Sequence, residues 1–158
     1  MQARDESDPA AANAVARIVE VEVAVRDVEA ASQRLASAFG TVASVPATER
    51  TEGLEVTMSA LTLGGARLGF IQDATGSGPV ARFLEKRGEG IYSVLVVVPN
   101  LSEAMARMRK AGIRLFPEQP QVLEHVERDG ERFSKISIVW THPTTTHGVL
   151  IELQERER

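Results

Sequence analysis

Apolar and polar residues alternate with a period of two over residues 18–25, which predicts a half-buried strand. Over residues 28–39 the apolar positions recur at helical spacing instead. Asp27, directly before this second segment, is a residue type that caps the start of helices, and Gly40 stands where a left-handed residue ends them. The chain therefore opens with a strand followed by a helix.

Two more strands and a short helix follow. Residues 54–63 alternate again, and Gly64-Gly65 predicts a hairpin turn into a strand at 68–71. Pro79 is a favourable first residue for a helix over 80–86.

The second half of the chain repeats this order. Its pattern predicts a strand at 91–98, a helix at 101–111, and three strands at 122–126, 133–140 and 149–153. A shift of 73 residues places Val21 on Val94 in the strands and Val28 on Leu101 in the helices. Because strand phase, cap and helix phase agree under one shift, we predict an internal duplication.

The repeated order predicts an α+β fold built from two βαβββ modules. We assign the modules to residues 17–72 and 90–154, joined by a helical linker at 73–89 within a single domain over 17–158. Residues 1–16 are small, polar and acidic, which is typical of a disordered leader.

Composition excludes several classes of function. The 18 basic and 22 acidic residues give a net charge of −4, so no basic field exists to bind nucleic acid. The absence of cysteine excludes disulfides, thiolate nucleophiles and cysteine-ligated metals. No apolar run has the length of a membrane span, and no signal peptide is recognisable, so we expect a cytoplasmic protein that binds no membrane.

Two segments resemble a known family. Residues 79–90 (PVARFLEKRGEG) look like a helix-and-linker signature, and Thr141-His142-Pro143 with residues 148–153 (GVLIEL) looks like a last hairpin and strand. Both are similar to the vicinal oxygen chelate (glyoxalase/bleomycin-resistance-like) superfamily, in particular to the methylmalonyl-CoA epimerases. The resemblance implies one curved mixed sheet around a cleft and a small-molecule substrate such as an acyl-CoA thioester. It is also compatible with a homodimer.

Family members usually hold a divalent metal with four side chains. Carried over by position, these fall on Glu20, Gly69, Ser93 and Glu152, of which Glu152 alone matches the usual ligand. Glycine offers no ligand atom and a neutral hydroxyl is a poor one, so the resemblance implies a lost metal site and no cofactor. The alternative is a divalent cation bound weakly by Glu20 and Glu152.

Without a metal, Glu152 and Glu20 become the candidate acid–base pair, because two nearby carboxylates in a cleft divide the charged and neutral forms between them. Taken alone, Glu20 and Glu22 would instead mark the solvated face of a strand. The resemblance also implies a second base just before the strand that starts near residue 53, from Glu49 or Glu52, although the simpler interpretation of either is an ordinary loop carboxylate.

The expected substrate contacts are four residues of mixed type. Ser93 and Gly69 follow from the family positions, whereas Tyr92 is a candidate pocket wall that can also be a core aromatic. His147 either reaches the cleft or lies on a turn.

These residues predict an epimerase-like isomerase or lyase that moves a proton next to a carbonyl, without metal. The alternative is a metal-free protein of the same fold that sequesters a small molecule. The low count of aromatic residues, five Phe with one Tyr and one Trp, speaks modestly against that alternative.

Overall fold

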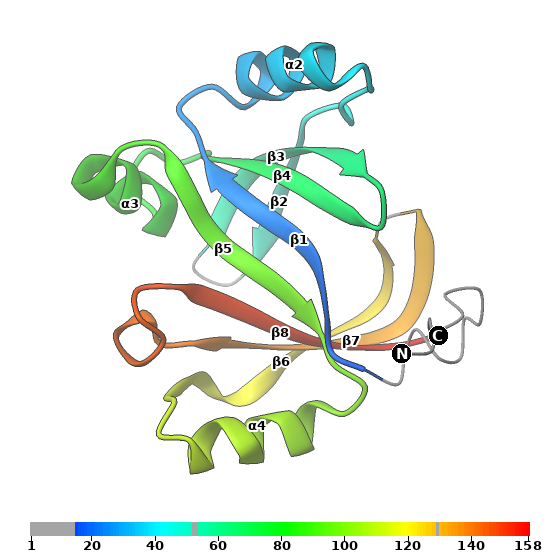
Figure 1. The fold of residues 1–158 in the computed structure, drawn as a ribbon, viewed down its shortest axis with the longest axis vertical. Helices are drawn as coiled ribbons and strands as arrows, with labels where there is room; N and C mark the ends of the chain where they lie inside the picture. The colour runs from blue at the N-terminus through cyan, green and yellow to red at the C-terminus, as the bar shows by residue number, and fades with distance from the viewer. Residues whose placement is uncertain (1–14, 52–53, 129) are drawn as a thin grey trace, which may run out of the picture. The chain divides into compact units, whose positions relative to one another are not determined.

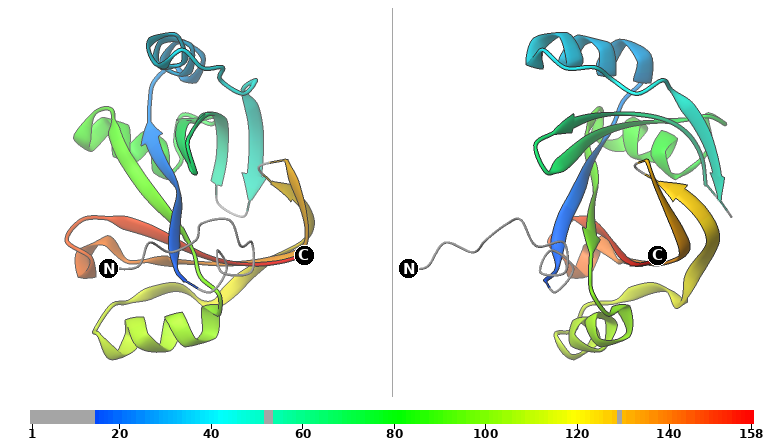
Figure 2. Two further views of the ribbon diagram at one scale, coloured as in Figure 1. Left: turned by 45° about the vertical axis from the view of Figure 1, so that its right-hand side comes forward. Right: turned by 90° about the vertical axis from the view of Figure 1, so that its right-hand side faces the viewer.

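The computed structural model describes residues 15–51, 54–128 and 130–158. The chain divides into an N-terminal unit, Val19–Val94, and a C-terminal unit that joins Leu95–Arg158 to residues 15–18. Figure 1 and Figure 2 show the elements of each unit. Among the described residues, no helix is long and apolar enough to cross a membrane.

The N-terminal unit is built on a sheet with the strand order β2-β3-β4-β1. Strand β1 runs parallel to β4, whereas β2, β3 and β4 pair antiparallel, so the sheet is mixed. Helix α2 packs on β3 and β4, and α3 packs on β4 (Figure 1). The elements are β1 (Arg17–Ala24), α2 (Val28–Phe39), β2 (Ala47–Thr51), β3 (Leu54–Leu63), β4 (Ala66–Asp73) and α3 (Pro79–Arg87).

The C-terminal unit carries an antiparallel sheet in which β7 lies between β6 and β8. Helix α4 packs on one face of β6 and β8 (Figure 2), where Leu101 and Met105 meet Val139 and Leu153 in a buried apolar cluster. Strand β5 passes from the N-terminal unit into this one. The elements are β5 (Gly90–Val97), α4 (Leu101–Lys110), β6 (Leu115–Arg128), β7 (Glu131–Thr141), the 3-10 turn η1 (Pro143–Thr145) and β8 (Leu150–Glu157).

The predicted duplication is present in the element order. Strands β1 and β5 begin 73 residues apart, and so do helices α2 and α4. Each is followed by three strands, which confirms the βαβββ order twice. The predicted cap is also confirmed, because Asp27 accepts a hydrogen bond from the Ala30 N–H at 2.9 Å and Gly40 adopts φ +64°.

Three strand predictions need correction. Strand β2 was missed because its residues, ATERT, show no apolar alternation; it forms as an edge strand by pairing with β3. Glu49 therefore lies on a strand and not in a loop. Strand β6 begins at Leu115, with an irregular register between Phe116 and Gln121, and β8 continues to Glu157. Residues 1–14 of the expected leader and Glu52 lie outside the described residues.

Asp73 caps helix α3 from outside the helix. Its Oδ1 accepts hydrogen bonds from the backbone N–H groups of Thr75 at 2.9 Å and Gly76 at 2.8 Å. Its Oδ2 accepts from the Ala81 N–H, in the first turn of the helix, at 3.3 Å. The N-cap residue itself, Gly78, has no side chain to serve this purpose, so Asp73 takes the role that the sequence assigned to no residue.

Substitution Asp73→Ala should lower the free energy of unfolding by about 1 kcal/mol, the usual contribution of a helix cap. Burial raises the pKa of Asp73, but hydrogen bonds from Thr75, Ala81 and Gly76 outweigh burial and hold the pKa below its ordinary value of 3.8. The contribution is therefore complete above the unfolded-state pKa and is lost as pH falls through the folded-state pKa. Denaturant unfolding from neutral to acid pH measures it.

Asn100→Ala is the matched control. Asn100 caps α4 by accepting from the Glu103 N–H at 2.9 Å, but its amide does not titrate. The loss caused by Asn100→Ala should therefore vary less with pH. An Asp73→Ala loss that stays constant down to strong acid would contradict the assigned role.

Candidate functional site

Strand β1 carries two buried carboxylates. Glu20 is 5% exposed and Glu22 is 8% exposed, so the expectation of a solvated strand face is wrong. In the parallel register with β4, Glu20 lies opposite Arg67 and Glu22 lies opposite Gly69. Charged side chains are rarely buried to this degree without a partner, so their neighbours decide what they can do.

Glu20 occupies space that Gly69 leaves empty. A Cβ atom built on Gly69 would overlap Glu20 Oε1 and would approach its Cδ to 3.2 Å. On the other side, Arg67 Nε lies 3.9 Å from Glu20 Oε2, which brings a positive charge to the buried carboxylate. The glycine is thus a condition for the observed position of Glu20.

Glu22 accepts a hydrogen bond from β5, the first strand of the second module. The Ser93 hydroxyl, 2% exposed, donates a short hydrogen bond to Glu22 Oε2. The hydroxyl proton is thereby directed at a carboxylate. Sequence reasoning gave Glu22 no role, because its partner lies 71 residues further along the chain.

Tyr92 points into the apolar packing beneath α3. Its ring meets Phe83 edge-on, with 5.2 Å between centroids, and both rings pack against a cluster that includes Val80 and Leu84. Burial raises the pKa of Tyr92, and the negative charge of Glu22 raises it further. The phenol therefore stays protonated at neutral pH.

Glu152 is the centre of a hydrogen-bond chain in the C-terminal unit. Trp140 Nε1 donates to Glu152 Oε2 at 2.9 Å, and Gln154 Nε2 donates to Glu152 Oε1. Arg156 Nε in turn donates to Gln154 Oε1 at 2.8 Å. Because a guanidinium cannot accept, this last bond fixes the orientation of the fully buried Gln154 amide and points its N–H group at Glu152.

Two other candidates lie on the surface. His147 is exposed in the turn between η1 and β8 and has a positive φ of 56°. Glu49 is exposed on β2, opposite Val56 of β3. Neither takes part in the hydrogen bonds around Glu22 and Glu152.

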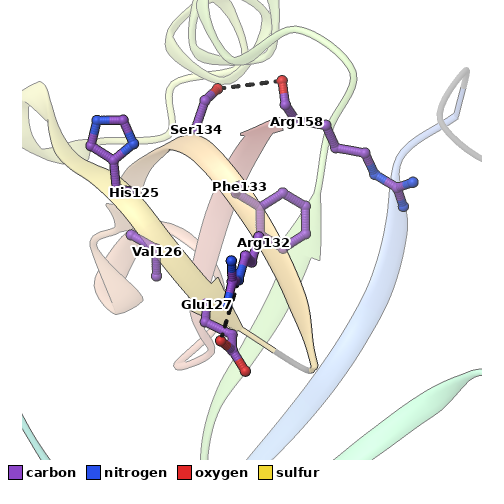
Figure 3. Close-up of a pocket in the computed structure, with 7 residues that line it drawn as sticks. All are labelled: His125, Val126, Glu127, Arg132, Phe133, Ser134 and Arg158. Carbon is purple, nitrogen blue, oxygen red and sulfur yellow. Dashed lines mark hydrogen bonds and ion pairs between the residues drawn. The ribbon is translucent and has the colours of Figure 1, made fainter.

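A cavity of about 550 Å³ lies along the β6–β7 hairpin, and Figure 3 shows its lining. Arg132 pairs with Glu127 at 3.8 Å on one side, and Ser134 donates to the Arg158 carbonyl at 3.4 Å on the other. None of the catalytic or substrate-binding residues predicted from the sequence lines this cavity. It is lined by His125, Val126, Glu127, Arg132, Phe133, Ser134 and Arg158.

Comparison with known proteins identifies the class. The profile of the Glyoxalase/Bleomycin resistance protein/Dioxygenase superfamily matches residues 20–129, and the chain belongs to this superfamily. Among its relatives is the ethylmalonyl-CoA/methylmalonyl-CoA epimerase of Cereibacter sphaeroides, 27% identical over 143 residues that cover 89% of this chain and 98% of the relative. The resemblance inferred from the sequence is confirmed.

Solved structures give the same result for the fold. Methylmalonyl-CoA epimerase from Mycobacterium tuberculosis superposes with a TM-score of 0.71 at 26% identity, covering 89% of this chain and 88% of that one. The Streptomyces coelicolor methylmalonyl-CoA epimerase in complex with 2-nitronate-propionyl-CoA gives 0.69 at 25% identity, covering 88% and 93%. The predicted glyoxalase-like fold class is confirmed.

The residues present do not fit the metal that the superfamily implies. Position 69 has no side chain, and a ligand side chain there would collide with Glu20. The Ser93 hydroxyl is already directed at Glu22. Within the described residues, no group of three or more His, Asp or Glu side chains is arranged to hold a metal.

Substitution Gly69→Ala should destabilise the protein by about 1 kcal/mol, because the new methyl group overlaps the buried Glu20 carboxylate and displaces it from its position beside Arg67. The same substitution in a Glu20→Ala background should cost much less, since the colliding carboxylate is gone. Thermal and denaturant unfolding of the four proteins gives the coupling.

Gly65→Ala is the control for glycine replacement. Gly65 lies in the β3–β4 turn, and nothing lies within 4 Å of a Cβ built there. It should leave stability nearly unchanged. An equal cost of Gly69→Ala in both backgrounds would show that Glu20 is not what the glycine accommodates.

Proposed function

We propose that this protein is an isomerase that moves the α-proton of an acyl-CoA thioester, with Glu152 and Glu20 as its acid–base groups and without a metal. The relatives named as epimerases of methylmalonyl-CoA support the reaction class. The observation that carries the assignment is the Glu152 carboxylate, held by two directed donors on strands β7 and β8.

Glu152 acts as the base in this proposal. Trp140 and Gln154 can only donate from the nitrogen atoms that face it, so Glu152 accepts on both oxygens and its orientation is set by neighbouring side chains. The carboxylate takes the α-proton, the C–H electron pair moves into the enolate, and negative charge develops on the thioester oxygen. Pre-oriented groups of this kind lower the barrier because they need no rearrangement during the reaction.

Glu20 supplies the second proton-transfer group. It returns a proton to the opposite face of the α-carbon, which inverts the configuration. The Arg67 guanidinium, 3.9 Å from Glu20, contributes the positive charge that an enolate needs where no metal is present. Glu20 starts this turnover protonated and ends it ionised, whereas Glu152 starts ionised and ends protonated. Glu20 takes up a proton from solvent and Glu152 releases one, which restores the starting state.

Four further residues contact the substrate in this proposal. We assign them to Ser93, Tyr92, Gly69 and His147. Ser93 acts together with Glu22, to which its hydroxyl donates. Gly69 contributes backbone only, and His147 contributes from the exposed turn before β8.

Incubation of the protein with racemic 2-methylacyl-CoA thioesters in D2O should introduce deuterium at the α-carbon, measured by mass spectrometry. Glu152→Gln keeps the shape of the side chain and removes its base, so it should lower exchange by about 10²-fold or more with an unchanged melting temperature. Glu20→Gln should lower exchange less if Glu20 tunes or reprotonates.

Glu157→Gln is the matched control, because Glu157 lies on the same strand but pairs with Lys135 at the surface, at 2.7 Å. It should exchange like the unmodified protein. Full exchange in folded Glu152→Gln would remove Glu152 from the mechanism and direct attention to Glu49 and His147. Tight binding of a thioester without any exchange would favour the sequestering alternative.

Metal analysis gives an independent check. Because Gly69 and Ser93 offer no competent ligand, the purified protein should carry less than one Co, Ni, Zn or Mn per chain, and its exchange activity should survive a chelator. One transition metal per chain, retained through chelation, would contradict the metal-free part of the proposal.

A further inference from the structure

Three aromatic side chains form a shelf on the C-terminal unit, which we define as Phe116, Trp140 and His142. Phe116 and Trp140 stack at 6.1 Å between centroids with an interplanar angle of 23°. His142 meets Phe116 edge-on at 6.2 Å. These rings come from β6, from β7 and from the residue that follows β7.

The shelf lies directly beside Glu152. In the antiparallel register, Phe116 is opposite Trp140, and Trp140 is opposite Glu152, so the three side chains form one row on one face of the sheet. The Trp140 indole N–H reaches Glu152 Oε2 at 2.9 Å. The opposite face, with Val139 and Leu153, is occupied by α4.

The shelf is fixed in position but not fully covered. Arg114 donates to the Thr144 hydroxyl at 2.8 Å and approaches His142 Nδ1 to 3.4 Å, and Thr144 lies 2.8 Å from the same nitrogen. Phe116 nevertheless remains 42% exposed. A rigid and partly open aromatic surface is suited to bind a flat apolar group.

Charge determines which flat group it suits. A substrate carboxylate placed next to the α-carbon would lie near the Glu152 carboxylate and be repelled by it. The two groups that donate hydrogen bonds to Glu152 are an indole and an amide, and both are uncharged. An apolar substituent avoids this repulsion and gains contact with the rings.

The shelf is within one side chain of the proposed base, so it contacts the acyl part of the substrate. The nucleotide of coenzyme A is separated from the thioester by the whole pantetheine arm, so it does not reach the shelf while the α-carbon lies at Glu152. We propose that the acyl group carries an apolar, aromatic substituent at or next to the α-carbon, which stacks on Phe116 and Trp140. This inference rests on the proposed proton transfer by Glu152.

The test compares α-deuterium exchange for three thioesters: 2-phenylpropionyl-CoA, 2-methylbutyryl-CoA and methylmalonyl-CoA. The aryl thioester should have the highest kcat/KM and the dicarboxylic one the lowest. Phe116→Ala should lower kcat/KM for the aryl thioester by about 3- to 10-fold, as expected for loss of one ring contact, and should change the aliphatic one less. Phe39→Ala, which removes an exposed ring on α2, should change neither.

Binding has its own readout, because Trp140 is the single tryptophan of the chain. Addition of 2-phenylpropionyl-CoA should quench or shift its emission, and methylmalonyl-CoA should do so only at higher concentration. The fluorescence experiment uses the unmodified protein and does not depend on whether Phe116→Ala folds.

Faster exchange of methylmalonyl-CoA than of the aryl thioester would overturn the inference and leave the proposed isomerase intact. An equal effect of Phe116→Ala on all three thioesters, or no response of Trp140 to the aryl ligand, would overturn it as well. Exchange of none of the three, with normal folding, would instead contradict the proposed function on which the inference rests.

Discussion

The parallel pairing of β1 with β4 is the constraint on which the N-terminal unit depends. It sets Glu20 opposite Arg67 and Glu22 opposite Gly69. Since Gly69 has no side chain, Glu20 can lie buried in the space beside it. A buried carboxylate needs compensating charge or hydrogen bonds, and Arg67 and Ser93 supply these to Glu20 and Glu22. In the same arrangement Gly69 offers no ligand atom to a metal, and the Ser93 hydroxyl is directed at Glu22.

The C-terminal unit has the same order of strands but surrounds its carboxylate with different groups. Its carboxylate, Glu152, is held by neutral donors from Trp140 and Gln154, and the Gln154 amide is oriented by Arg156. The duplicated modules therefore differ in what surrounds their acidic groups, although they agree in their backbone pattern. The superfamily defines the scaffold, and chemistry depends on the side chains that each member places on it.

A proton-transfer enzyme that works without a metal has to stabilise the enolate with its own side chains. A Lewis acid stabilises an enolate by direct charge, and without it the protein needs fixed cations and hydrogen-bond donors. In the proposed mechanism Arg67 is the fixed cation, and the donors to Glu152 orient the base. We propose that the aromatic shelf adds a preference for apolar acyl groups, because an apolar substituent avoids repulsion by the Glu152 carboxylate.

The sequence by itself determined the βαβββ repeat, the caps of α2 and the superfamily, because these depend on local periodicity, on cap chemistry and on short segments such as residues 79–90. It could not find β2, whose polar residues form a strand only by pairing with β3. Nor could it find the burial of Glu20 and Glu22, the Ser93–Glu22 bond or the row from Phe116 to Glu152. These features join residues far apart in the chain, so strand register and packing decided them, and no local pattern encodes register between distant strands.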